Sequence, residues 1–294
     1  MMNGAINAVL DDGRLHLQHG PIDLIIEAWA DQPNEIKLAY QQASMRFSGL
    51  LASLVEELRQ LRTPLSDTYP LFGGPVAKRM ASAVWPYRGQ FITPMAAVAG
   101  AVADEILAVM LQQRDIKRAY VNNGGDIALH LVLGEAFDIG IAGIEDAAVK
   151  GQFIIAADDG IRGVATSGWR GRSFSLGIAD SVTVLARTAA EADAAATMIA
   201  NAVNIDHPGI ERVPAYEIRE DSDLGSLLVT RHVPAFNRAS VNAALYAGAE
   251  TAQRYQRNGL FNYAVLRLQG EVRLVGGSDK ILGPAGTKKF VCAM

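Results

Sequence analysis

Apolar residues recur at a helical spacing in two long segments of the chain, residues 34–62 and 94–113. In the first segment, large aliphatic side chains repeat near a 3.6-residue period between Pro33 and Pro64, which favour a helix start and a helix end. In the second, the first two turns are almost all alanine and glycine, and Gly100 costs about 1 kcal/mol relative to alanine. Small residues of this kind indicate close packing against a sheet, or else the approach of a ligand or a neighbouring backbone.

A different pattern begins near residue 117, where short β-rich runs alternate with glycine and aspartate turns. The predicted strands are residues 118–121, 127–133, 137–141, 152–157, 163–166, 181–186, 261–268 and 271–275, with an earlier hairpin over residues 8–17. Asp158-Asp159-Gly160 predicts a further hairpin turn. The other predicted helices are residues 75–84, 189–203 and 238–257, and Thr188 begins a capping box for the second of them. Strands interspersed with helices favour an α+β fold over a strict βαβ order.

The chain shows no internal repeat and no low-complexity linker along its 294 residues. We therefore expect one unit over residues 1–294. The change of pattern leaves open two closely packed subdomains, about 1–116 and 117–294. The two long apolar helices offer more apolar surface than a modest sheet covers, so we also expect a homodimer.

Composition and charge exclude several classes of protein. The net charge is −4, so the chain lacks the basic footprint of a nucleic-acid-binding protein. The single cysteine, Cys292, excludes an intrachain disulfide and a cysteine-based zinc site. Residues 1–13 contain no Lys or Arg, unlike a secretory signal, and Asp104 and Glu105 interrupt the most membrane-like segment, Met95–Leu111. We expect a soluble, cytoplasmic protein that binds neither nucleic acid nor a membrane.

Two glycine-containing turns could hold an anion. Asn123-Gly124-Gly125-Asp126 lies between two predicted strands, where paired glycines can turn backbone N–H groups toward a ligand. The same residue types also form ordinary hairpin turns that bind no ligand. The second turn, Thr166-Ser167-Gly168, ends another strand. It is followed by Arg170 and Arg172, whose guanidinium groups are good phosphate donors, although solvated arginines in a polar turn would look alike.

The helix predicted over residues 189–203 carries a stripe of short polar side chains. Asp193, Thr197, Asn201 and Asn204 follow one another at spacings that put them on one face. A solvated face would explain the stripe. A carboxylate and a hydroxyl one turn apart could also share a Mg²⁺ ion, which prefers oxygen ligands and keeps several waters. None of the five histidines has a metal-binding or triad-like spacing.

Together these segments resemble the ApbE-type flavin transferases, which move FMN from FAD onto a protein threonine. The similar strings are RAYVNNGGD (118–126), ATSG (165–168) and SVTVLARTAAEADAAAT (181–197). Three further strings, GGPVAKRMASAV (73–84), FITPMAAVAGAVADEI (91–106) and RSFSLGIADSVTV (172–184), resemble the UPF0280 family, an ApbE-like branch. This resemblance spans most of the chain and implies an ApbE-like, T-fold-related arrangement of mixed or antiparallel sheets backed by long helices.

The resemblance also implies a site. Asp193 and Thr197 match the carboxylate and hydroxyl that bind Mg²⁺ in flavin transferases, and Ala97 to Gly100 matches the helix start that supplies a carbonyl. The residues that would contact a bound FAD, flavin or nucleotide are Ala97, Gly100, Asn123, Gly124, Gly125, Asp126, Thr166, Ser167, Gly168, Arg170, Arg172 and Asp180.

One departure from the flavin transferases keeps three functions open. Their His-Ile-Ile-Asp-Pro stretch is absent, because residues 173–180 read SFSLGIAD. The first hypothesis is a Mg²⁺-dependent enzyme that acts on a flavin or nucleotide pyrophosphate. The second is a binding protein that keeps the pocket without turnover. The third is a different step of cofactor biosynthesis, for example of a pterin type, on the same scaffold. The Asp193 and Thr197 pair favours the first, and the missing stretch favours the other two.

Overall fold

The computed structural model describes residues 5–142, 149–277, 281–282 and 291–293. Its strands are β1 (Ile6–Val9), β2 (Leu15–His19), β3 (Ile22–Trp29), β4 (Arg118–Asn123), β5 (Asp126–Leu131), β6 (Ala136–Ala142), β7 (Val149–Ala156), β8 (Gly163–Ser167), β9 (Ser181–Ala186), β10 (Glu211–Pro214), β11 (Leu228–His232), β12 (Tyr263–Leu268), β13 (Glu271–Val275), β14 (Ile281–Leu282) and β15 (Val291–Ala293). Its α-helices are α1 (Pro33–Phe47), α2 (Leu50–Glu56), α3 (Leu58–Leu61), α4 (Pro75–Val84), α5 (Val98–Met110), α6 (Ala189–Ala202), α7 (Ala215–Ile218) and α8 (Arg238–Arg257).

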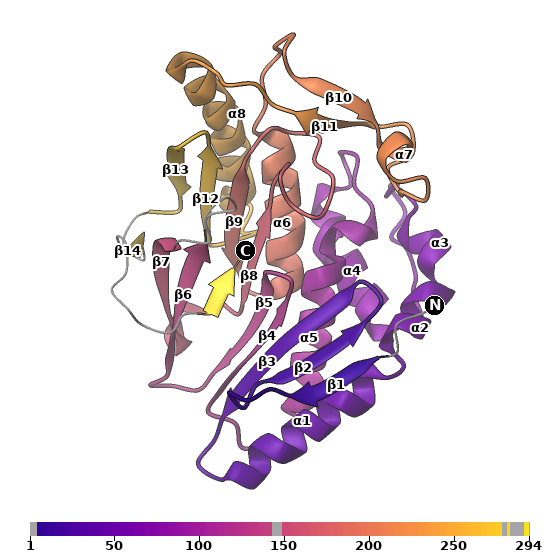
Figure 1. Ribbon diagram of the computed structural model, residues 1–294, viewed down its shortest axis with the longest axis vertical. Helices are drawn as coiled ribbons and strands as arrows, with labels where there is room; N and C mark the ends of the chain where they lie inside the picture. The colour runs from indigo at the N-terminus through magenta and orange to yellow at the C-terminus, as the bar shows by residue number, and fades with distance from the viewer. Residues whose placement is uncertain (1–4, 143–148, 278–280, 283–290, 294) are drawn as a thin grey trace.

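The strands form a large sheet and two smaller ones (Figure 1). The large sheet is antiparallel throughout and has the order β1-β2-β3-β4-β5-β8-β9-β12-β13. A second sheet, β14-β7-β6-β15, is mixed, because β15 runs parallel to β6. Strands β10 and β11 pair only with each other. The expected α+β class with mixed or antiparallel sheets and long helices is confirmed.

The large sheet lies between a helical layer and the β6–β7 sheet. Helix α5 packs on β4 and β5, α6 packs on β8 and β9, and α8 packs on β12 and β13. Side chains alternate between the two faces, as strand geometry requires. Ala119 and Val121 of β4 belong to the core under the helices, whereas Tyr120 belongs to a second core with Phe137 and Phe153 of the smaller sheet.

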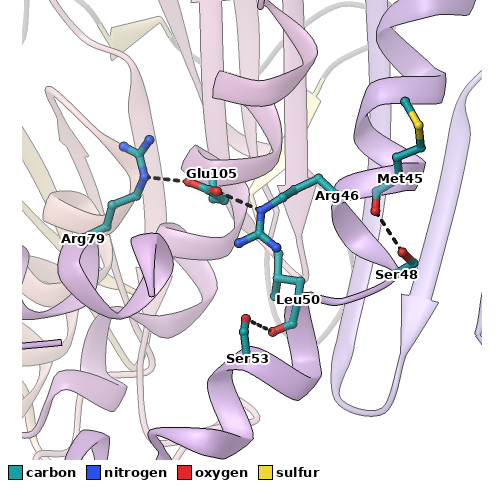
Figure 2. Close-up of polar contacts among 7 residues, drawn as sticks. All are labelled: Met45, Arg46, Ser48, Leu50, Ser53, Arg79 and Glu105. Atoms are coloured by element: carbon teal, nitrogen blue, oxygen red, sulfur yellow. Dashed lines mark hydrogen bonds and ion pairs between the residues drawn. The ribbon is translucent and has the colours of Figure 1, made fainter. Parts of the chain in front are cut away.

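The predicted helix over residues 34–62 is wrong as a single element, because the chain breaks after Phe47 and again at Glu57. Near the first break, the hydroxyl of Ser48 donates to the carbonyl of Met45 at 2.9 Å, and glycine at position 49 lowers the helix propensity. Figure 2 shows what fixes the end of α1: Arg46 donates to the buried Glu105 of α5 at 2.9 Å. Arg79 of α4 donates to the other carboxylate oxygen at 3.3 Å, so one buried acid ties three helices together.

The hairpin predicted around Asp158-Asp159-Gly160 is also wrong. A turn does form there, a 3-10 turn (Ala157–Asp159) that ends in a left-handed Gly160, φ 69°. The strands on its two sides belong to different sheets, so the turn connects layers and not neighbouring strands. A local turn signal cannot distinguish these cases, because it fixes chain reversal and not strand pairing. The sequence analysis also missed β3, β10, β11, β14, β15 and α7.

The large sheet takes strands from both halves of the chain, with β1 to β3 at one edge and β12 with β13 at the other. The choice between one unit and two subdomains stays a prediction. No helix in the described ranges is long and apolar enough to cross a lipid bilayer.

Candidate functional site

Four segments that are distant in sequence meet where the helical layer covers the centre of the large sheet. They are the β4–β5 turn, the end of β8, the start of α5 and the first half of α6. Three hydrogen bonds connect them: Asn123 Nδ2 to the Ala99 carbonyl at 3.1 Å, the Thr166 N–H to Asp126 Oδ1 at 3.2 Å, and the Gly100 N–H to Asp193 Oδ2 at 3.1 Å. The structure therefore brings together all four of the segments that the sequence singled out.

Helices α5 and α6 cap each other. Asp193 of α6 accepts from the N–H of Gly100 in the first turn of α5, and Asp104 of α5 accepts from the N–H groups of Ala189 and Ala190, at 3.0 and 2.9 Å. These N–H groups lack partners inside their own helices, so each carboxylate satisfies part of the other helix's N-terminus. A Cβ at Gly100 would overlap the Ala189 carbonyl. The sequence left open whether the small residues allow packing on a sheet or the approach of a ligand or a neighbouring backbone. At Gly100 the close neighbour is the backbone of α6.

The site contains two aspartates, Asp126 and Asp193, whose ionised forms are destabilised by burial. Burial raises the pKa of Asp126 to about 7, against the opposing effects of the Thr166 N–H and the Arg172 charge. Burial also raises the pKa of Asp193, and the charge of Asp126 raises it further. A cation bound beside Asp126 and Asp193 would stabilise the ionised forms of both carboxylates. The residues present therefore fit a hard metal ion.

The ligand set for such an ion would have to be mixed. Among the residues described by the structure, no three His, Cys, Asp or Glu side chains cluster so as to hold a metal ion. Oxygen atoms of hydroxyls, backbone carbonyls and water would complete the coordination of Mg²⁺, which commonly keeps several waters. Thr197 lies half-buried one turn beyond Asp193, and Ala97 is the fully buried N-cap of α5.

The other two residues of the predicted stripe, Asn201 on α6 and Asn204 two residues beyond its end, have structural partners. Asn201 Oδ1 accepts from the Leu176 N–H at 2.9 Å and fixes the loop before β9. Asn204 Oδ1 accepts from Arg212 at 2.7 Å. The sequence pattern placed all four residues on one face, but only Asp193 and Thr197 stay candidates for a metal.

The β4–β5 turn is a tight hairpin in which Asn123 pairs with Asp126. Gly124 and Gly125 have φ values of 63° and 113°, which glycine adopts readily. The Gly125 N–H donates to Asn122 Oδ1 at 2.8 Å, so this amide is engaged within the turn. The guanidinium of Arg172 lies against the Cα of Gly124. The two are so close that a Cβ at position 124 would be 2.6 Å from Arg172 Cζ.

The end of β8 lies beside β9. The hydroxyl of Thr166 is 2.9 Å from the hydroxyl of Thr183, and Ser167 is half-buried as the last residue of the strand. A Cβ at Gly168 would overlap the Asp180 carbonyl, which explains the glycine by the close return of the chain. The Thr166 backbone is thus the part of this strand end that contacts another candidate residue, Asp126.

Asp180 and Arg170 contact each other and brace the loop between β8 and β9. Asp180 Oδ1 accepts from Arg170 Nε at 3.2 Å and from Trp169 Nε1 at 3.3 Å, while Oδ2 accepts from the Gln269 N–H. The Arg170 guanidinium also lies over the Trp169 ring, 4.8 Å from its centroid. These contacts give both residues a role in fixing the loop.

Sequence reasoning missed a connection between this loop and the start of the small-residue helix. We call residues 211–232, which comprise β10, α7 and β11, the arm. Asp223 of the arm accepts from the buried Thr93 hydroxyl at 2.9 Å, just before the 3-10 turn Pro94–Ala97 that leads into α5. Thr230 of the arm donates from its N–H to the Ser175 carbonyl at 2.9 Å. Thr93 precedes a proline, a recognisable N-cap position, but nothing local identifies its partner.

A family model described as "AbpE bacteria" matches residues 7–274. The chain belongs to this family. It is also 32% identical over 195 residues to a UPF0280 protein of Methanothermobacter thermautotrophicus, a match that covers 61% of this chain and 74% of that protein. The resemblance to UPF0280 as an ApbE-related family is confirmed.

Other relatives match over a shorter stretch. A UPF0280 protein of Methanospirillum hungatei is 37% identical over 147 residues, which is 49% of this chain and 58% of that protein. The chain therefore covers less than two thirds of the length of that relative.

Two solved structures of ApbE proteins are similar to the chain at low sequence identity. The flavin transferase ApbE from Vibrio cholerae gives a TM-score of 0.48 at 13% identity, covering 92% of this chain and 97% of that one. The apo flavinyl transferase ApbE of Pseudomonas stutzeri gives 0.48 at 11% identity, covering 97% and 98%.

Proposed function

We propose that this protein binds a flavin or nucleotide pyrophosphate together with Mg²⁺ and acts as a transferase in flavin or related cofactor metabolism. The observation that carries the proposal is the pairing of Asp126 and Asp193, two carboxylates whose pKa values are raised by burial and, for Asp193, by the other's charge. A divalent cation would stabilise the ionised forms of these carboxylates. It would also neutralise the negative charge of a pyrophosphate bound beside them.

Each candidate residue has a role in this proposal. Asp193 and Thr197 would hold the metal, with a carbonyl from Ala97 to Gly100, and the metal would neutralise phosphate charge. The Gly124 turn and the end of β8 would line the space for the rest of the ligand. Asp193 is held by the Gly100 N–H, so its carboxylate is pre-oriented before any ligand arrives.

A second function, cofactor binding without turnover, has its own support. The loop over residues 173–180 lacks the histidine and proline of flavin transferases, and its Asp180 is engaged by Trp169 and Arg170. Binding energy and transition-state stabilisation are separable, so a site can keep its ligand without the reaction.

Calorimetric titration with FAD, with and without Mg²⁺, tests the proposal. We expect Mg²⁺-dependent binding by the wild-type protein and weaker binding by Asp193→Ala. The matched control is Asp206→Ala, which removes an exposed carboxylate just beyond α6 and should bind as the wild type does. The visible spectrum and mass spectrometry of the purified protein would identify a small molecule that it retains. No heat with any flavin or nucleotide would refute the proposal.

A further inference from the structure

Two arginines follow the Thr166-Ser167-Gly168 strand end, and the structure separates their roles. Arg170 is ion-paired with Asp180 and stacked on Trp169. Arg172 is exposed, and within the described part of the chain it forms no ion pair at bonding distance. Its charge does reach Asp126, whose ionised form it favours. Arg172 is thus an exposed cation close to Asp126, and its guanidinium N–H groups can donate to a ligand.

The position of Arg172 depends on a residue that has no side chain. The guanidinium lies on the Cα of Gly124, and a Cβ there would be 2.6 Å from Cζ and 3.3 Å from Nη1. No side chain other than hydrogen leaves room for this contact. The positive φ of Gly124 adds a second reason for glycine, so the two reasons have to be separated by experiment.

The backbone of the same turn is a poorer anion site than its sequence indicates. The Gly125 N–H is used by Asn122, and Arg172 covers Gly124. The Arg172 guanidinium therefore occupies the space beside the Gly124 backbone. Guanidinium presents a planar fork of donors that matches two phosphate oxygens at once.

We infer that Arg172 binds the phosphate oxygens of the ligand, and that Gly124 is a specificity-determining residue because it seats the Arg172 guanidinium beside the carboxylate pair. The inference rests on the proposed function and deepens it. It assigns the anion contact to Arg172 and not to Arg170 or to the glycine backbone. The ligand class is a pyrophosphate group, whose charge the two aspartates would repel without this cation and the metal.

Calorimetric titration with inorganic pyrophosphate and Mg²⁺ tests the arginine. Arg172→Ala should weaken binding by about 10- to 100-fold, the range for a charge-assisted hydrogen bond. Arg172→Lys should give an intermediate loss, because lysine keeps the charge but not the fork. Arg187→Ala, which removes an exposed arginine at the start of α6, should bind as the wild type does. A greater loss with Arg170→Ala than with Arg172→Ala would overturn the assignment.

The glycine is tested by adding a methyl group without removing any charge. Gly124→Ala should weaken pyrophosphate binding when Arg172 is present and should add no further loss to Arg172→Ala. Gly134→Ala is the matched control, because Gly134 has φ 89° but no atom within 4 Å of the added carbon. It should carry the backbone strain and leave the affinity unchanged.

The outcomes separate this inference from the proposal beneath it. Unchanged affinity in Gly124→Ala would overturn the seating role. If the wild type binds pyrophosphate with Mg²⁺ and Arg172→Ala binds equally well, this inference fails and the proposed function stands. If the wild type binds neither pyrophosphate nor FAD, both fail.

Discussion

The carboxylate of Asp193 accepts a hydrogen bond from the backbone N–H of Gly100, 3.1 Å away and 93 positions earlier in the chain. The residue predicted as a metal ligand is therefore also a cap for the helix that was predicted to supply a carbonyl ligand. Most substitutions of Asp193 will therefore remove the helix cap and the negative charge together. A substitution that keeps the cap and removes only the charge can distinguish the two roles.

Asparagine and alanine at position 193 separate these two effects. Asp193→Asn keeps an oxygen that can accept from Gly100, so we expect near wild-type thermal stability but loss of Mg²⁺-dependent FAD binding. Asp193→Ala also loses the cap and should be less stable by about 0.5–2 kcal/mol. Denaturant unfolding and calorimetry measure the two effects. Retained Mg²⁺ dependence in Asp193→Asn would contradict the role as a ligand.

Asp104 makes the stability of the fold depend on pH. Burial raises its pKa from 3.8 to about 6, although the hydrogen bonds that it accepts from two N–H groups of α6 lower it. The folded state therefore holds this proton more tightly than the unfolded state, so the stabilisation is complete below pH 4 and is lost as the pH rises through 6. The loss could reach about 3 kcal/mol. Urea unfolding of wild type and Asp104→Asn between pH 4 and 7 should show a stability difference that changes over this window, and a constant difference would count against it.

The hydrogen bond between Thr93 and Asp223 holds the arm to the start of the small-residue helix. Asp223→Ala leaves a buried hydroxyl without this partner, which costs about 1–3 kcal/mol, whereas the double variant Thr93→Val/Asp223→Ala removes both groups. We expect the single variant Asp223→Ala to be less stable than the double variant. A double-mutant cycle by denaturant unfolding measures the coupling, and purely additive effects would show that the bond contributes nothing.

FMN transfer should be poor even if flavin binds. Flavin transferases carry a histidine and a proline in the stretch that reads SFSLGIAD here. We expect little or no FMN on a standard target peptide after incubation with FAD and Mg²⁺, read as a mass shift of the peptide. An ApbE flavin transferase under the same conditions serves as the positive control. Efficient transfer would show that neither missing residue is required in this chain.

A homodimer also stays a prediction, but one of the two apolar helices that motivated it is covered within the chain. The small-residue helix α5 is packed against α1, α6 and the sheet, and most of its side chains are buried. On α1 and α2, which form from residues 34–62, the exposed large apolar side chains are Met45 and Val55, at 69% and 57% exposure. Light scattering at micromolar concentration should report twice the mass of the chain, and a monomer would contradict the prediction.

Local signals in the sequence determined much of the fold. The helix over residues 238–257 and the strand over residues 181–186 have the predicted bounds, because capping residues and side-chain periodicity act over a few positions. Thr188 caps α6 by accepting from the Glu191 N–H, as its sequence predicted. The motifs also identified the four segments that converge on the candidate site, and the family resemblance is confirmed.

Only the tertiary structure decided how these elements pair and what each side chain contacts. The turn at Gly160 looks like a hairpin turn but joins two sheets, because strand pairing is decided by partners far away in sequence. Arg170 and Arg172 are alike in sequence, and only folding gives one of them Asp180 and places the other on Gly124. Asp193 and Asp104 look like ordinary helix positions until the two helices lie side by side. Sequence periodicity records which residues share a face, whereas the partner of that face depends on contacts between distant segments.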